Sequence, residues 1–151
     1  MNPSLLLKIG TIILLLYSTG HTLGAVLFYR PHTPEEAAII DSMKSYHVPL
    51  KTSSARTLWD FYYGFGLAVG FLNYALAAFA WVAAVQVSKG NAAAVGPICW
   101  ILAIACLSQS YLSWRYFFIF PLALSLLAAI VFIAAYFSLP LGAISARISG
   151  S

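Results

Sequence analysis

The chain has 151 residues, of which 62% are hydrophobic and only 8% are charged, and its mean hydropathy is +0.88. Soluble globular domains carry roughly 25% charged residues, so this composition excludes a soluble domain and predicts a membrane protein. The formal net charge of +4 comes from basic residues that are scattered singly, which excludes a basic patch for nucleic acid.

Four apolar stretches are long enough to cross a hydrocarbon core about 30 Å thick, which takes roughly 20 helical residues each. They cover residues 5–29, 58–87, 95–114 and 119–139. Backbone groups in lipid must be satisfied internally, and these stretches lack the strict alternation of barrel strands, so each is predicted to be a transmembrane helix. The sequence therefore predicts an all-α, multi-pass integral membrane protein, a four-helix up-down bundle formed as one domain over residues 1–151.

The start of the first stretch has features of a secretory signal peptide, because Lys8 precedes an apolar run that small residues follow. The apolar character continues through residues 24–29, however, and gives a full spanning length. A retained first helix is the favoured interpretation.

The polar connection at residues 30–56 is predicted to contain a helix of its own. Thr33, Pro34 and Glu36 match an N-cap, a first-turn proline and a capping-box acid. Apolar residues then recur at helical spacing: Ile39, Ile40, Met43 and Tyr46. A short amphipathic helix is therefore predicted over residues 34–46, with its apolar face buried either at the membrane interface or against the mouth of the bundle.

Ionisable residues collect at the loop-side end of the predicted bundle. His21 lies roughly 13 Å below that surface, Asp60 begins the second span, and Arg115 ends the third. Ionisable groups within spans usually face the bundle interior and pair, which predicts a polar pocket with an ion pair between Asp60 and Arg115. Aromatic residues of the same helices are predicted to bind substrate there: Trp59, Tyr63, Tyr74, Tyr111 and Trp114.

These groups are suited to acid–base chemistry. An aspartate beside a guanidinium stays ionised and can serve as a base. His21 can exchange the proton, and Arg115 or a tyrosine hydroxyl can hold a developing oxyanion. The predicted catalytic residues are thus Asp60, His21 and Arg115. The set predicts an enzyme acting on a lipophilic small molecule by epoxide opening, double-bond isomerisation or cyclisation.

Each of these residues also has a structural explanation. Thr57 to Asp60 fits the capping-box pattern, in which the acid binds free N–H groups at a helix start. His21 can be a hydrogen-bonded helix contact, Arg115 can reach the headgroups, and the aromatic rings can form an interfacial belt. The alternative prediction is a non-catalytic four-span protein that binds lipid or supports a partner complex. A channel or transporter is a third prediction.

Small residues at four-residue spacing indicate close helix packing. Gly20 with Gly24, and Gly64 with Ala68, form such pairs on the first and second predicted helices. They predict close packing of helix backbones, and in the non-catalytic alternative they form the contact surface together with the helix at residues 34–46. The predicted partners are therefore membrane lipid, a lipophilic substrate and a second copy of the chain, with no nucleic acid.

No metal site and no cofactor are predicted. His21, His32 and His47 lack metal-ligand spacing, and no phosphate-binding glycine motif occurs. Cys99 and Cys106 lie seven residues apart on one predicted helix, which places their Cα atoms about 10 Å apart, too far for a disulfide. They are predicted to be core thiols.

Three blocks, "GHTLGA", "RTLWDFYYGFGL" and "LSWRYFFIFP", occur in this order along the chain. With them the chain resembles a family of small, mostly uncharacterised four-span membrane proteins. It is also similar to small integral membrane epoxide hydrolases of fungal polyketide pathways, which open polyene epoxides to build cyclic ethers. This second resemblance implies an epoxide hydrolase or cyclase of secondary metabolism. The residues that it carries over are His21, Trp59, Asp60, Tyr63, Trp114 and Arg115.

Overall fold

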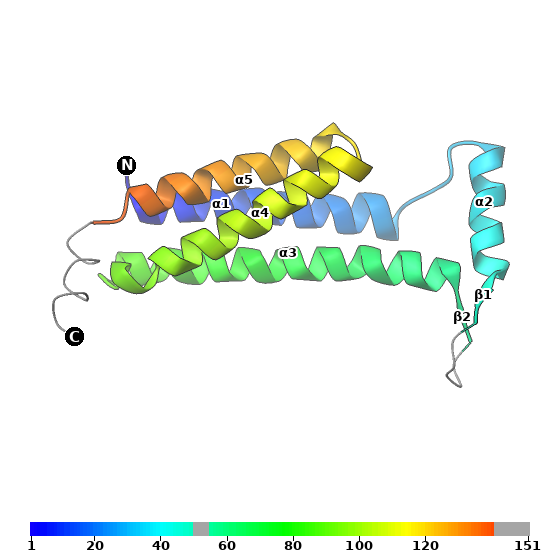
Figure 1. Ribbon diagram of the computed structural model, residues 1–151, viewed down its shortest axis with the longest axis horizontal. Coiled ribbons are helices and arrows are strands. Elements are labelled where there is room, and N and C mark those ends of the chain that lie inside the picture. Colours follow the sequence, from blue (N-terminus) through cyan, green and yellow to red (C-terminus); the bar gives the residue numbers. More distant parts are fainter. Residues whose placement is uncertain (50–54, 141–151) are drawn as a thin grey trace. The chain divides into compact units, whose positions relative to one another are not determined.

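The computed structural model of the protein describes residues 1–49 and 55–140 (Figure 1). The α-helices within this part of the chain are α1 (Pro3–Gly20), α2 (Pro34–Ser45), α3 (Leu58–Ser88), α4 (Gly96–Tyr116) and α5 (Ile119–Phe137). A π-helix, η1 (His21–Leu27), directly follows α1, and a short 3-10 helix, η2 (Ala92–Ala94), precedes α4. Two short strands, β1 (His47–Val48) and β2 (Arg56–Thr57), pair antiparallel.

The prediction of four spanning helices is confirmed. Four helical segments are long and apolar enough to cross a membrane: Pro3–Leu27, Leu58–Ser88, Ala92–Tyr116 and Ile119–Phe137. Because their backbone groups are satisfied within each helix, they can lie in lipid without unpaired N–H or C=O groups. The chain is therefore an all-α, multi-pass integral membrane protein.

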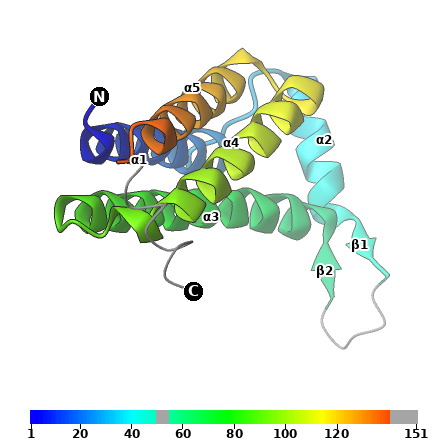
Figure 2. The ribbon, with the colours of Figure 1, turned by 60° about the vertical axis from the view of Figure 1, so that its left-hand side comes forward.

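The contacts between residues divide the chain into two units. We call Ser18–Leu72 the loop unit, and Met1–Tyr17 together with the described residues from Asn73 onward the bundle unit. Both α1 and α3 contribute to each unit. Figure 2 shows α2 and the β1–β2 hairpin, which belong entirely to the loop unit.

Within the bundle unit, hydrogen bonds show how the helices run. The Ser4 hydroxyl at the start of α1 donates to the Ala84 carbonyl near the end of α3, at 3.0 Å, so these two helices are antiparallel. The Ser110 hydroxyl of α4 donates to the Ser125 hydroxyl of α5, at 2.9 Å. Small side chains fill much of the core between the helices and let the backbones approach closely. The fully or almost fully buried alanines are Ala77, Ala80, Ala83, Ala84, Ala103, Ala128, Ala129 and Ala135.

Polar and sulfur-bearing side chains are also part of this core. Asn73 of α3 is completely buried and accepts a hydrogen bond at 3.0 Å from the side-chain amide of Gln109 on α4. Such a bond between spans contributes about 0.6–2 kcal/mol. Cys99 and Cys106 are free and buried, which confirms that they are core thiols.

The loop unit contains the predicted amphipathic helix. Thr33 caps α2, and its hydroxyl oxygen accepts a hydrogen bond from the Glu36 backbone N–H at 3.2 Å. The Glu36 carboxylate in turn accepts hydrogen bonds from the Tyr29 hydroxyl and, at 2.6 Å, from the His32 backbone N–H. The predicted helix is confirmed and ends at Ser45. The β1–β2 hairpin that follows it was not predicted from the sequence.

Candidate functional site

The first feature of the candidate site is an unusual helical turn that carries His21. The π-helix η1 continues α1, and its wider turn is closed by a hydrogen bond from the Phe28 N–H to the Leu23 carbonyl, at 2.9 Å. π-helical turns occur often at functional sites, because the extra residue changes the direction in which side chains point. The hydropathy of the sequence did not distinguish this segment from ordinary helix.

His21 contacts the second span through its imidazole. Its Nε2 atom lies 2.9 Å from the carbonyl oxygen of Gly66 on α3. A carbonyl oxygen can only accept a hydrogen bond, so Nε2 must carry the proton. In a neutral ring the basic lone pair is then on Nδ1. This bond therefore fixes both the orientation and the tautomer of the ring.

Two glycines of α3 make this close approach between helices feasible. A Cβ atom at Gly66 would lie 2.8 Å from the Val26 side chain, and one at Gly70 would collide with the Thr22 hydroxyl. The Ser18 hydroxyl adds a hydrogen bond to the Gly70 carbonyl, at 2.7 Å. The glycine pair that α3 uses against the α1–η1 segment is thus Gly66 and Gly70.

Within the loop unit, the glycines of the predicted small-residue pairs do not form the contact between η1 and α3. A Cβ atom built on Gly20, Gly24 or Gly64 meets nothing within 4 Å among the described residues. Gly64 and Gly66 lie two residues apart, on different faces of α3. The sequence pattern therefore predicted the correct helix for this contact, but a different face of that helix.

Asp60 is the second feature of the site, and it caps α3. The Thr57 backbone N–H donates to the Asp60 carboxylate at 2.8 Å, and the Asp60 backbone N–H donates to the Thr57 hydroxyl at 3.2 Å. This reciprocal pair is a capping box, so the structural interpretation of Asp60 is confirmed. The side chain is exposed at the start of the helix. A carboxylate in this position remains accessible to water or to a ligand.

The His21 imidazole and the Asp60 carboxylate lie at different positions along the length of α3. Gly66, the partner of His21, is six residues beyond Asp60, which corresponds to roughly 9 Å of helix rise. The carboxylate bonds back toward Thr57, away from that level. The two groups therefore do not share one proton directly.

The remaining predicted site residues are divided between the two units. Trp59 and Tyr63 lie with His21 and Asp60 in the loop unit, and the ring centroids of Trp59 and Tyr63 are 6.4 Å apart. The bundle unit holds the other four: Tyr74, Tyr111, Trp114 and Arg115. The pairing of Arg115 with Asp60, and a pocket that all eight residues share, stay predictions.

In the bundle unit, aromatic rings accompany Arg115. Its guanidinium carbon lies 5.3 Å from the ring centroid of Tyr116, and the rings of Tyr111 and Trp114 are 6.2 Å apart. The side chains of Tyr111 and Trp114 are exposed, as interfacial aromatic residues of a membrane protein are. This arrangement suits a belt at the headgroups.

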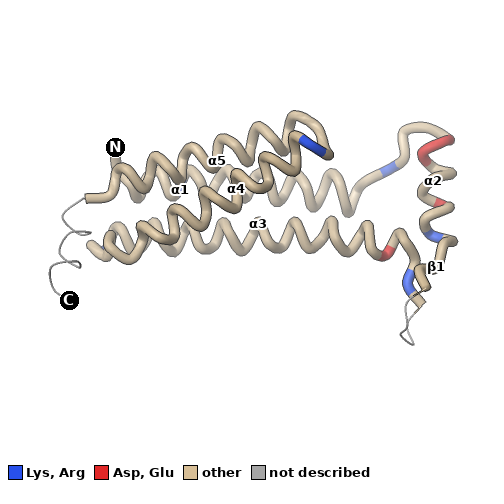
Figure 3. Tube along the Cα trace, in the orientation of Figure 1, with Lys and Arg blue, Asp and Glu red and all other residues tan. Residues whose placement is uncertain are grey.

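Most of the charged residues that the structure describes in the loop unit lie on α2, and the others precede α2 or lie on β2 and at the start of α3 (Figure 3). The Nζ atom of Lys44, a residue that the sequence did not single out, lies 3.9 Å from the Asp41 carboxylate and 5.5 Å from the ring centroid of Trp59.

Glu35 lies in the first turn of α2. Its carboxylate accepts hydrogen bonds from the Glu35 backbone N–H and from the Thr33 side chain, and these bonds lower the pKa of Glu35. The contribution of Glu35 to the start of α2 is therefore present at neutral pH and is lost as the pH falls through this lowered pKa.

An apolar hollow of about 450 Å³ lies beside α2. It is open to the outside, and residues of α2, the following turn and the start of α3 line it: Ala38, Ile39, Ser42, Met43, Tyr46 and Leu58.

Over residues 1–49 and 55–140, no three His, Cys, Asp or Glu side chains come together as a metal site would require.

Comparison of the chain with protein-family models, with curated proteins and with solved structures finds no match. The four long apolar helices support the coarser part of the resemblance, that of a small four-span membrane protein.

Proposed function

We propose that the chain is a membrane-embedded enzyme that uses acid–base chemistry on a lipophilic small molecule, most concretely hydrolysis or cyclisation of an epoxide. The observation that carries this proposal is the His21 imidazole, which a π-helical turn presents within a span and which Gly66 holds through Nε2. Ionisable side chains within spans are costly and usually serve a function.

The proposed reaction uses the His21 imidazole as the proton acceptor. The imidazole takes a proton from water, or from a hydroxyl of the substrate, as that oxygen bonds to an epoxide carbon. The carbon–oxygen bond of the ring breaks, and the alkoxide formed takes a proton back from the imidazolium, so that protons balance. Tyr63, which lies in the same unit as His21, steadies the alkoxide through its hydroxyl. Asp60 lies about 9 Å along α3 from the level of His21, and water molecules between them relay the proton from the imidazolium to its carboxylate and back during turnover.

The activity is tested directly with purified protein in lipid vesicles. The probe is a long-chain terminal epoxide in isotopically labelled water, and the product is measured by mass spectrometry. We expect a diol that carries one labelled oxygen, formed faster than in vesicles without protein. A diol rate equal to that of empty vesicles, with polyene epoxides also unchanged, would contradict the proposal.

Asp60→Asn and Thr57→Ala separate catalysis from capping. Asparagine keeps the oxygen that accepts the Thr57 N–H but removes the charge, so we expect turnover to fall by about 10²-fold with little change in thermal stability. Thr57→Ala removes the other half of the cap and keeps the carboxylate. We expect it to cost about 1 kcal/mol of stability, with turnover per folded molecule retained. Unchanged turnover in Asp60→Asn would remove Asp60 from the mechanism.

A second candidate function is favoured by the capping box itself. The reciprocal bonds with Thr57 give Asp60 a structural role that needs no catalysis. The chain would then be a non-catalytic four-span protein that binds lipid or supports a partner complex. Under this alternative, both variants change only stability, and no epoxide is converted by the wild-type protein.

A further inference from the structure

We infer that α2 lies along the membrane surface, with the face formed by Ile39, Met43 and Tyr46 immersed at the boundary between headgroups and acyl chains. The partner of this face is the bilayer itself. The inference does not depend on catalysis, because it concerns only the connection between the first two spans.

The C-terminal end of α2 is attached to the start of α3. The Leu58 N–H donates to the Tyr46 carbonyl at 3.0 Å, and β1 and β2 pair in the register His47 with Thr57 and Val48 with Arg56. The C-terminal end of α2 is therefore fastened to the residue at which α3 begins. Because α3 is a spanning helix, that residue is the end of a segment that crosses the bilayer.

The direction of α2 also favours a position at the membrane surface. Figures 1 and 2 both show α2 running across the start of α3. A helix that crosses the end of a spanning helix in this way runs along the membrane plane. This is the arrangement of an interfacial amphipathic helix.

The exposed face of α2 is apolar in composition. Ile39, Met43 and Tyr46 follow the spacing i, i+4 and i+7 and share one side of the helix. Ile39 is 62% exposed and Tyr46 is 57% exposed, although both line the apolar hollow. Leu58, which closes this hollow, belongs to the span, so the apolar face of α2 is continuous with a surface that lipid covers.

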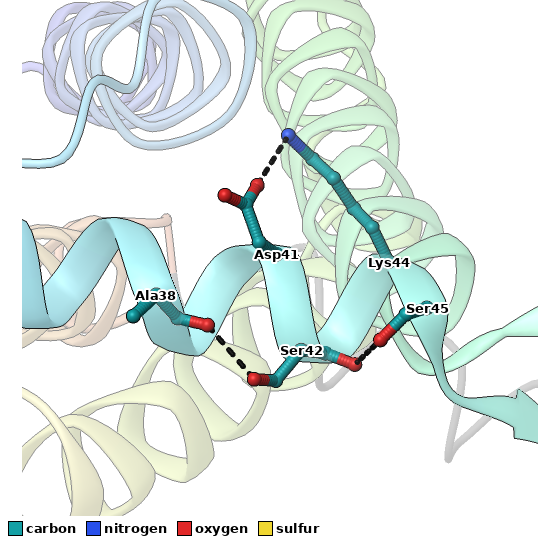
Figure 4. A network of polar contacts seen from close by, with 5 residues as sticks. All are labelled: Ala38, Asp41, Ser42, Lys44 and Ser45. Atoms are coloured by element: carbon teal, nitrogen blue, oxygen red, sulfur yellow. Dashed lines mark hydrogen bonds and ion pairs between the residues drawn. The ribbon is translucent and has the colours of Figure 1, made fainter.

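The polar atoms near this face are already satisfied. The Ser42 hydroxyl, at the edge of the hollow, donates to the Ala38 carbonyl at 2.8 Å, and the Ser45 hydroxyl donates to the Ser42 carbonyl at 3.0 Å (Figure 4). The Ser42 hydroxyl can therefore approach the acyl region without leaving its donor unpaired. Figure 4 also shows Asp41 and Lys44 together on another side of the helix.

Aromatic and basic residues near this face also favour a position at the membrane interface. Trp59 stacks near Tyr62, with ring centroids 5.4 Å apart, and both follow directly on the start of the span. Aromatic residues of this kind are enriched at the membrane interface. Lys44, above the Trp59 ring, can extend its ammonium group to lipid phosphates while its stem covers apolar surface.

Spin labels on the full chain in lipid nanodiscs test the inference. A nitroxide is attached at Ile39→Cys, at Met43→Cys and, as the matched control on the exposed polar side, at Ser45→Cys. Labelled wild-type protein gives the background from Cys99 and Cys106, which are buried. We expect the labels at 39 and 43 to collide several-fold more often with oxygen than with a water-soluble nickel complex, and the label at 45 to show the reverse.

Two other outcomes would overturn the inference. Ready collision of all three labels with the nickel complex would mean that α2 stands away from the bilayer. Protection of the labels at 39 and 43 from both reagents would mean that protein covers this face, either a second copy or the mouth of the bundle. Ile39 is exposed and Met43 is partly exposed, so neither substitution removes a core contact.

Discussion

Replacing His21 with glutamine is expected to lower the conversion of a lipophilic epoxide by about 10²- to 10⁴-fold while the protein stays folded. The side-chain amide of glutamine can donate a hydrogen bond to the Gly66 carbonyl, as Nε2 does in the wild-type protein. It has no basic nitrogen, so it cannot take a proton from water. The measurement is the initial rate of diol formation in vesicles, together with the unfolding midpoint in detergent.

His21→Ala is the control for this experiment. Alanine removes both the base and the hydrogen bond to α3, so it should abolish turnover and also destabilise the protein by about 0.6–2 kcal/mol. Activity that survives in His21→Gln but not in His21→Ala would show that the imidazole only holds the helices together. The catalytic assignment of His21 would then be wrong.

The spans could be predicted because hydropathy alone decides them. A stretch of approximately 20 apolar residues inserts into the bilayer whichever neighbours it packs against. The predicted start of α3 is therefore confirmed at Leu58. The start of α2 could also be predicted, because the capping bond joins Thr33 and Glu36 within one turn of the chain. The π-helix was not predictable, because over seven residues an apolar segment has the same composition in either helical form.

The contacts between helices depend on information that is not local. The second predicted span contains three glycines within seven residues, Gly64, Gly66 and Gly70, and the rotation of the helix decides which of them meets its neighbour. The bond between His21 and Gly66 follows from that rotation. The capping box at Thr57 and Asp60 was predicted because it needs only one turn of chain. The grouping of Arg115 with these residues stays a prediction.

Gly10→Ala is expected to destabilise the bundle unit by about 1–3 kcal/mol. A Cβ atom at this position of α1 would lie 2.6 Å from the Cζ atom of Phe132 on α5. Phe132 is completely buried in the core, so its ring cannot move away without disturbing several neighbours. Thermal or denaturant-induced unfolding in detergent measures the loss.

Two further variants identify the cause of this destabilisation. Gly20→Ala, also on α1, adds the same methyl group where a Cβ atom meets nothing within 4 Å, so the higher helix propensity of alanine should make it neutral or stabilising by up to about 1 kcal/mol. Phe132→Leu alone should destabilise by leaving a cavity. In the double variant with Gly10→Ala, the new methyl group fills part of that cavity, so the combined loss should be smaller than the sum of the two single losses. Additive losses would mean that α1 and α5 do not touch at Gly10 and Phe132, and the helix packing of the bundle unit would have to be redrawn.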